Sequence, residues 1–215
     1  MELSQRLADG RSRRVVFVSH CLLNENTRYL GGARRPGPVR EVIDACLRSG
    51  VGMVQLPCPE QLAWGGVLKR RLLRLYGAAP ASGAALAGRK ALVPLALAWT
   101  RIRYTRLARR VVAQMADYAR SGFEVVGAIG VDGSPSCGVQ TSLAPACLAE
   151  TAAVGTNALT VEKQNELVRR HARPGRGLFV EALERELARR GLSVRLLAHD
   201  LLTELDGRPT PFDLD

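Results

Sequence analysis

The sequence predicts an α/β fold in which a Rossmann-like parallel sheet is flanked by helices. Short apolar runs of strand length alternate with segments that have one apolar helical face, and turn residues stand at the junctions. Buried parallel strands are typically continuous apolar runs, because helices cover both faces of the sheet. The chain has 215 residues, the size of a single domain, so we predict one α/β domain over residues 1–215.

The first strands and the helix between them are predicted from local pattern. Residues 15–19 and 51–56 are the two apolar runs. Residues 39–49 place Val42, Ile43 and Cys46 on one helical face, and Gly50 follows as a stop signal. Strand, helix and strand in this order predict a parallel β-α-β unit.

A basic segment over residues 68–110 separates this unit from the rest, and we interpret it as a helical insertion. Residues 68–76 are predicted to be helical, and residues 77–88, rich in Ala, Gly and Pro, to be a loop. A helix over residues 105–121, ending before Gly122, is predicted to lead into a third strand at residues 123–131.

The remaining elements complete the alternation. Residues 179–190 have an apolar helical face and end before Gly191, and residues 193–197 form a short apolar strand. The tail over residues 201–215 is acidic and contains Pro, so we predict that it is peripheral. The two standard phosphate-binding glycine motifs are missing.

The formal net charge of +11 is concentrated in one part of the chain. No acidic residue lies between Glu60 and Asp117, whereas this segment holds eleven Lys and Arg residues. Such a segment is either a solvated basic face or a surface that attracts nucleic acid, an acidic membrane surface or an anionic substrate.

The sequence indicates a protein that stays in the cytoplasm. It has no run of about 18 apolar residues, the length that predicts a transmembrane helix, and no apolar N-terminal stretch of the secretory type. Five cysteines are an odd number, which argues against a closed disulfide framework and fits reduced thiols in a reducing compartment.

Three of the five cysteines share a position in the pattern. Cys21, Cys58 and Cys137 each follow an apolar run, within a turn rich in Pro, Gly or Asn. Because the carboxyl ends of parallel strands lie side by side, these turns can bring the three thiols together. Thiolates are soft ligands that select iron–sulfur clusters, zinc or copper(I). Cys46 and Cys147 lie in apolar segments and are predicted to be buried apolar side chains.

The turns around these cysteines resemble the motifs of a known family. The segments CLLNENTRY, LPCPEQLAWGG and GVDGSPSCG occur in this order, and together they resemble the 2-thiouracil desulfurase family, most closely its larger branch of desulfidase-like members. The resemblance extends from about residue 15 to residue 139, and the later segment GRGLFVEALERELARRGL is also similar.

This resemblance implies a specific chemistry. In the family a 4Fe–4S cluster is held by three cysteines, which correspond to Cys21, Cys58 and Cys137, and its fourth iron binds the sulfur of the substrate. The catalytic acid–base glutamate and serine of the family correspond to Glu60 and Ser134. The implied reaction is a non-redox desulfuration, in which C=S in a small thiolated compound such as a thio-nucleobase is hydrolysed to C=O and sulfide is released.

Residues next to the motif cysteines are candidates for substrate binding. They are Asn24, Arg28, Tyr29 and Ser136. Two of the turns depart from the simpler family members, since residues 24–27 replace a Gly-containing turn and Gly133 stands where a lysine often precedes S-P-S-C-G. Because these residues line the expected pocket, the resemblance leaves open whether thiouracil itself is the substrate.

Two other functions remain open from the sequence. The chain can be a non-catalytic protein that uses its cysteines for a structural zinc or cluster and its basic insertion to bind RNA. It can also be a metal-free thiol enzyme in which Cys137 is the nucleophile.

Overall fold

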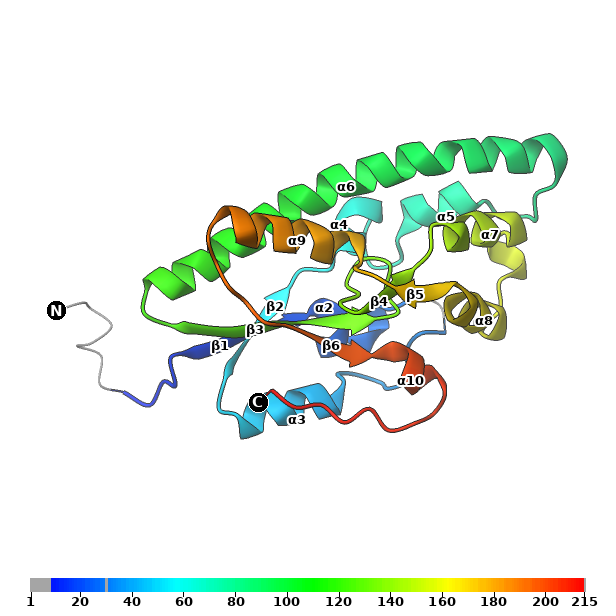
Figure 1. Ribbon diagram of the computed structural model, residues 1–215. Coiled ribbons are helices and arrows are strands. Elements are labelled where there is room, and N and C mark those ends of the chain that lie inside the picture. The colour runs from blue at the N-terminus through cyan, green and yellow to red at the C-terminus, as the bar shows by residue number, and fades with distance from the viewer. Residues whose placement is uncertain (1–8, 30, 215) are drawn as a thin grey trace.

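The computed structural model describes residues 9–29 and 31–214 and has three layers, with helices on both sides of a parallel sheet (Figure 1). The four strands pair in the order β2-β1-β3-β6. They are β1 (Arg14–Ser19), β2 (Gly52–Leu56), β3 (Glu124–Asp132) and β6 (Leu196–Asp200). The predicted fold class, a Rossmann-like parallel sheet flanked by helices, is confirmed.

The helices divide between the two faces of the sheet (Figure 1). On one face lie α4 (Pro59–Trp64), α5 (Arg70–Tyr76), α6 (Gly83–Arg120) and α9 (Leu178–Arg189). On the other face lie α3 (Arg40–Arg48) and α10 (Leu201–Leu205). Among the described residues, no helix combines the length and the apolar character that crossing a bilayer requires.

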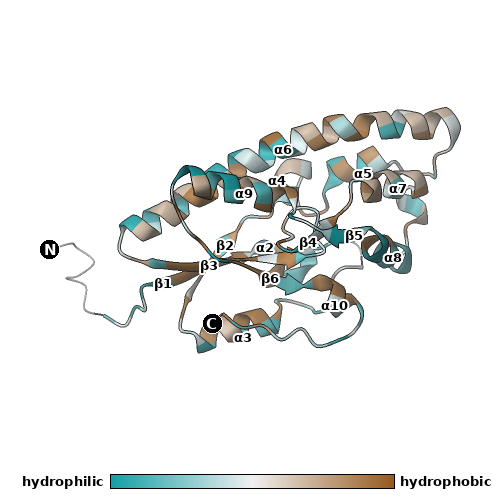
Figure 2. Cartoon of the chain, in the orientation of Figure 1, coloured by the Kyte–Doolittle hydropathy of each residue, from teal (hydrophilic) through white to brown (hydrophobic). Residues whose placement is uncertain are grey.

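Alternation along the strands produces two apolar cores. Val15 and Phe17 of β1 pack with α6 and α9, whereas Val16 and Val18 pack with α3 and α10. Successive side chains of a strand point to opposite faces, so a strand covered on both sides must be apolar throughout. Figure 2 shows the resulting apolar strands at the centre of the molecule.

The basic insertion is more helical than the sequence predicted. The segment 77–88 was expected to be a loop, but α6 already begins at Gly83 and continues through Pro94 for 38 residues. Alanine has the highest helix propensity, so this small-residue segment extends the helix that was expected only over residues 105–121. The C-terminal part of α6 packs against α9 and anchors the whole element.

The C-terminal tail is part of the core, contrary to the prediction that residues 201–215 are peripheral. Leu201 and Leu205 of α10 and Leu214 beyond it are buried against the sheet. The acidic residues that suggested a solvated tail have structural partners. Buried Glu204 pairs with arginines from the segment after β1, and Asp206 pairs with Arg169.

The region between β3 and α9 holds elements that no clear sequence pattern predicted. The strands β4 (Thr141–Leu143) and β5 (Ala172–Pro174) form a separate antiparallel pair. Between them lie α7 (Ala146–Val154), the short 3-10 helix η2 (Thr156–Ala158) and α8 (Val161–His171). The final strand, expected at residues 193–197, begins and ends three residues later as β6.

Candidate functional site

The strand order places three cysteines at one edge of the sheet. β2, β1 and β3 are adjacent and parallel, and a cysteine follows the carboxyl end of each. Cys21 lies in the one-turn helix α2 (His20–Leu23), Cys58 precedes the first residue of α4, and Cys137 lies in the loop after β3. In open α/β sheets this edge is where ligands bind.

The three thiols are close enough to influence one another electrostatically. Burial raises the pKa of Cys137 well above its ordinary value, and the thiols of Cys21 and Cys58 raise it further. Burial and the Glu60 carboxylate raise the pKa of Cys58 to about 12. Burial also raises the pKa of Cys21, against the opposing effect of Arg28. Without a bound cation, therefore, all three cysteines hold their protons at neutral pH.

No three or more His, Cys, Asp or Glu side chains in the described ranges are arranged so that they could hold a metal ion. The cysteine edge therefore does not form a ligand set of the closed zinc type, in which all ligands converge on a single ion. The free thiols of Cys46 and Cys147 are buried in the apolar interior, as predicted.

Hydrogen bonds from its backbone N–H groups to the side chain of Asp132 hold the loop that carries Cys137. Buried Asp132, at the end of β3, accepts hydrogen bonds on one oxygen from the N–H groups of Val139, Gln140 and Thr141, at 2.8, 2.8 and 3.2 Å. A Cβ atom at Gly138 would lie 2.1 Å from the carbonyl oxygen of Thr141, so only glycine fits there. The loop is thus a fixed support for the residues of the S-P-S-C segment.

A chain of hydrogen bonds joins this loop to the Cys58 turn. The Ser136 hydroxyl donates to Glu60 Oε1 at 3.1 Å, and the Ser134 hydroxyl lies 3.2 Å from that of Ser136. Ser134 Oγ also accepts from the N–H of Cys137 at 3.1 Å, which leaves its own proton for Ser136. Ser136 Oγ further lies 3.7 Å from Cys137 Sγ. Ser136 is thus the direct partner of Glu60, and Ser134 reaches this carboxylate through Ser136.

The sequence did not single out Lys69, which lies at this site. Its ammonium is 3.1 Å from Glu60 Oε2 and donates to the carbonyl oxygen of Thr27 at 3.0 Å, and the residue is only 8% exposed. Burial alone would lower the pKa of Lys69, but Glu60 and the Cys58 thiol more than offset this, and the net pKa is raised. The sequence analysis counted Lys69 among the cations of the basic insertion, because the local sequence pattern does not show which of these side chains points into the protein.

Two tyrosines of the same insertion also lie next to the site. Burial raises the pKa of Tyr104 well above its ordinary value, and Glu60 and Cys137 raise it further, while an interaction with Ser136 opposes them. Burial also raises the pKa of Tyr76, with smaller contributions from Cys147 and Glu60. Helices α5 and α6 thus each contribute a tyrosine whose pKa responds to Glu60.

We expect Lys69→Met to destabilise the protein by about 3 kcal/mol, because it leaves the mostly buried carboxylate of Glu60 without its cation. Urea unfolding under reducing conditions measures this loss. Arg70→Met, at the adjacent exposed position, is the matched control and should change stability by less than about 0.5 kcal/mol. Equal stability of the two variants would show that the Lys69–Glu60 pair does not support the site.

The candidate substrate residues differ in what the structure leaves them to do. The Asn24 side chain accepts from the N–H and the side-chain amide of Asn26 and so caps a turn. The Arg28 guanidinium is buried and pairs with Glu204 at 2.8 Å. The Tyr29 hydroxyl donates to Asn165 Oδ1 at 3.2 Å. Asn24 and Tyr29 thus have structural partners, and the position of Arg28 beside Cys21 keeps it a candidate.

Several buried polar atoms in the segments that carry Cys21 and Cys58 have no hydrogen-bond partner in the described part of the chain. They are Ser19 Oγ, His20 Nδ1, Arg28 Nε and Nη2, and Gln61 Nε2. A buried unsatisfied donor in a native fold indicates an acceptor that the protein chain does not supply. Soft thiol ligands together with such donors fit an inorganic sulfide cluster, whose sulfur atoms accept hydrogen bonds.

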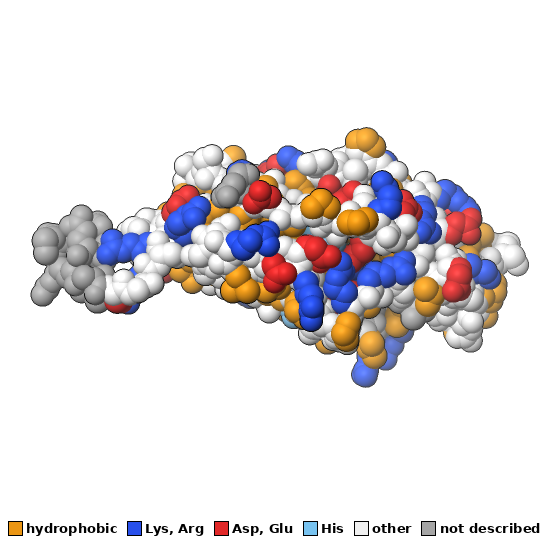
Figure 3. Space-filling view, turned by 90° about the horizontal axis from the view of Figure 1, so that it is seen from below, with side chains coloured by type: hydrophobic (Ala, Val, Ile, Leu, Met, Phe, Trp, Pro, Cys, Tyr) orange, Lys and Arg blue, Asp and Glu red, His pale blue; other side chains and the backbone are white. Residues whose placement is uncertain are grey.

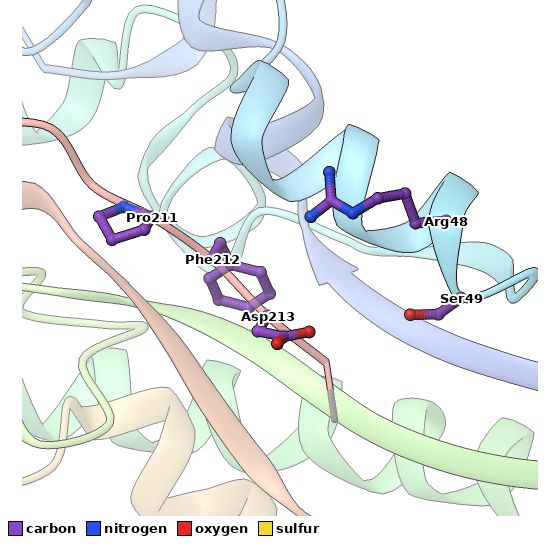
Figure 4. A pocket seen from close by; sticks show the side chains of 5 residues that line it. All are labelled: Arg48, Ser49, Pro211, Phe212 and Asp213. Carbon is purple, nitrogen blue, oxygen red and sulfur yellow. The ribbon is translucent and has the colours of Figure 1, made fainter.

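A separate surface pocket lies away from this site. Its lining residues are Arg48, Ser49, Pro211, Phe212 and Asp213 (Figure 4). They come from the end of α3 and from the C-terminal tail, so the pocket opens near the amino end of β2. None of the candidate site residues lines it.

The chain is thus an α/β protein with three cysteines at the carboxyl edge of its sheet, of which Cys137 is buried and Cys21 and Cys58 are partly exposed. The family model described as 2-thiouracil desulfurase matches residues 16–190, and the chain belongs to this family. A curated relative, the uncharacterized protein MJ0003 of Methanocaldococcus jannaschii, is 38% identical over 55 residues, which are 26% of this chain. The match spans only about a third (35%) of the length of that relative. No solved structure matches the chain.

Proposed function

We propose that this protein hydrolyses the C=S bond of a small thiolated compound, such as a thio-nucleobase, to C=O. Water supplies the oxygen, the carbon–sulfur bond breaks, and sulfur leaves as sulfide, so no electrons are exchanged with an external partner. Membership of the 2-thiouracil desulfurase family supports an enzyme of this type. The observation that carries the proposal is the hydrogen-bonded Glu60–Ser136 pair beside the cysteine edge.

Cys21, Cys58 and Cys137 are the residues that would hold a 4Fe–4S cluster. The fit rests on their soft thiol chemistry, their common edge and the unsatisfied donors beside them. A cluster binds its thiolates at different irons, so they need not converge on one ion. With three thiolates one iron would lack a protein ligand, and there the cluster would supply a Lewis acid for a soft thiocarbonyl sulfur.

Glu60 is the residue that moves protons in this proposal. Its Oε2 lies 3.1 Å from the Lys69 ammonium, and its Oε1 accepts a hydrogen bond from Ser136. As a carboxylate it can take a proton from the attacking water and return it to the substrate. The Ser134 and Ser136 hydroxyls donate along one direction toward Glu60 and keep the carboxylate oriented.

Burial of the thiols argues against the metal-free alternative with Cys137 as nucleophile. The thiolate is the reactive form of cysteine, and the raised pKa of Cys137 keeps it protonated at neutral pH. Binding of iron would instead displace these protons. A reducing cytoplasm, which we propose as the location, would keep the thiols available for that purpose.

The proposal is tested by sulfide release after anaerobic reconstitution with iron and sulfide. We expect the reconstituted protein to release one sulfide per oxygenated product from at least one thio-nucleobase or thioamide of a small panel, because the site combines an acid–base pair with soft ligands. Sulfide is measured colorimetrically and the product by mass spectrometry. The unreconstituted protein is the control. Absence of release from the whole panel by iron-loaded protein would contradict the proposed reaction.

A further inference from the structure

The outer face of α6 carries a stripe of exposed apolar side chains. Leu92, Leu95, Trp99 and Ile102 are 48%, 67%, 43% and 52% exposed. Their spacing of three and four residues places them on one face of the helix. The opposite face carries Tyr104 and the other residues that pack toward the sheet. The stripe therefore faces away from the sheet, on a helix that lies at the outer edge of the molecule (Figure 1).

Apolar exposure is concentrated in the part of the chain that carries this stripe. Eight of the eleven large apolar side chains that are exposed in the described ranges lie between residues 62 and 102. The guanidinium of Arg103 lies 5.5 Å from the centre of the Trp99 ring and donates to the carbonyl oxygen of Leu62 at 3.2 Å. Exposed Leu62 of α4 thus adjoins the stripe. Monomeric proteins rarely expose a contiguous apolar patch of this kind without a partner.

The charge around the stripe limits what can cover it. The same helical face continues beyond Ile102 with Arg106 and Arg110, both exposed. No acidic residue lies between Glu60 and Asp117, and the segment between them holds eleven cations. A second copy of the chain would bring like charges together, which is unfavourable. Nucleic acid would match the charge, but it would leave most of the aliphatic side chains without an apolar partner.

We propose that this docking surface, formed by Leu62, Leu92, Leu95, Trp99, Ile102, Arg106 and Arg110, binds the surface of an anionic lipid bilayer. The apolar side chains enter the interface between headgroups and acyl chains, and the arginines meet lipid phosphates. From Leu92 to Ile102 the stripe is about 15 Å long, at about 1.5 Å per residue, so the helix lies flat on the membrane. The inner face of α6 carries Tyr104, whose side chain interacts with Ser136, so the docking helix also contributes a residue to the candidate site.

The proposal is tested by co-sedimentation of the full chain with vesicles. One set contains equal parts of phosphatidylglycerol and phosphatidylcholine, and the other phosphatidylcholine alone. We expect partitioning to the anionic vesicles to be about tenfold stronger and to weaken at high salt. Leu95→Ser/Trp99→Ser is expected to weaken it by about tenfold or more, because both side chains would no longer enter the interface. This readout does not depend on desulfuration, so its failure leaves the proposed reaction untouched.

Matched controls are available on the opposite side of the sheet, where acidic and basic side chains are mixed (Figure 3). Arg106→Gln/Arg110→Gln should weaken binding, whereas Arg40→Gln/Arg48→Gln on α3, with the same change of net charge, should not. Leu47→Ser, which removes a 66% exposed leucine of α3, is the apolar control. In a Trp64→Phe background the emission of Trp99 should shift to shorter wavelength on anionic vesicles.

Three results would overturn the proposal. The first is equal partitioning of the wild-type chain and Leu95→Ser/Trp99→Ser to anionic vesicles. The second is a dimer in solution, by light scattering, that this double variant converts to monomer. The third is binding of a single-stranded RNA oligonucleotide that the double variant weakens, with no binding to vesicles.

Discussion

Alanine at Cys21, Cys58 or Cys137 is expected to abolish iron loading, while alanine at Cys46 leaves it intact. The first three cysteines follow adjacent parallel strands at one edge of the sheet, whereas Cys46 is buried on α3. A cluster with two remaining thiolates loses much of its protein ligation. Iron and acid-labile sulfide are measured after anaerobic reconstitution, and about four iron atoms per chain are expected for the wild type.

The Cys46→Ala control distinguishes loss of a cluster ligand from a general loss of stability. Cys46 and Cys137 are both buried, so alanine at either position leaves a small cavity and costs a similar amount of stability, on the order of 1 kcal/mol. If Cys46→Ala lost iron to the same extent as the others, the ligand assignment would be wrong. If Cys137→Ala alone removed activity and the protein needed no iron, the thiol-enzyme alternative would be favoured instead.

Glu60→Gln is expected to lower the turnover number for sulfide release by about 100-fold or more while the iron content stays unchanged. The amide keeps the shape of the side chain and can still accept from Ser136, but it cannot take a proton from water. The measurement is steady-state sulfide release from a thiolated substrate by protein of known iron content. Glu162→Gln, at an exposed position of α8, is the control.

The serines provide an internal comparison for the same mechanism. Ser136→Ala removes the donor to Glu60 and also breaks the path from Ser134, so it should slow turnover more than Ser134→Ala does. A fully active Glu60→Gln variant would remove this residue from the mechanism. The reverse order of the two serines would indicate that Ser134 acts on the substrate directly.

The parallel sheet could be predicted because its signals are local. Residues 15–19 are apolar throughout, which a strand covered on both faces requires, and residues 39–49 show a clear helical period. The long helix α6 was harder to predict, since Gly83, Gly88 and Pro94 are turn signals that the surrounding alanines outweigh. Position after a strand also singled out Cys21, Cys58 and Cys137, because strand ends meet at one edge whatever the loops between them.

The sequence by itself determined the layered α/β architecture, the burial of Cys46 and Cys147, and the edge at which the other three cysteines lie. Only the tertiary structure decided that Lys69 turns inward to Glu60 and that Tyr104 interacts with Ser136. It also decided that the C-terminal tail packs into the core that α3 and α10 form with the sheet. The physical reason is the separation in sequence over which the interactions act. Periodicity and turn chemistry act between neighbours in sequence, whereas the Lys69–Thr27 contact joins residues 42 positions apart and depends on how every intervening element packs.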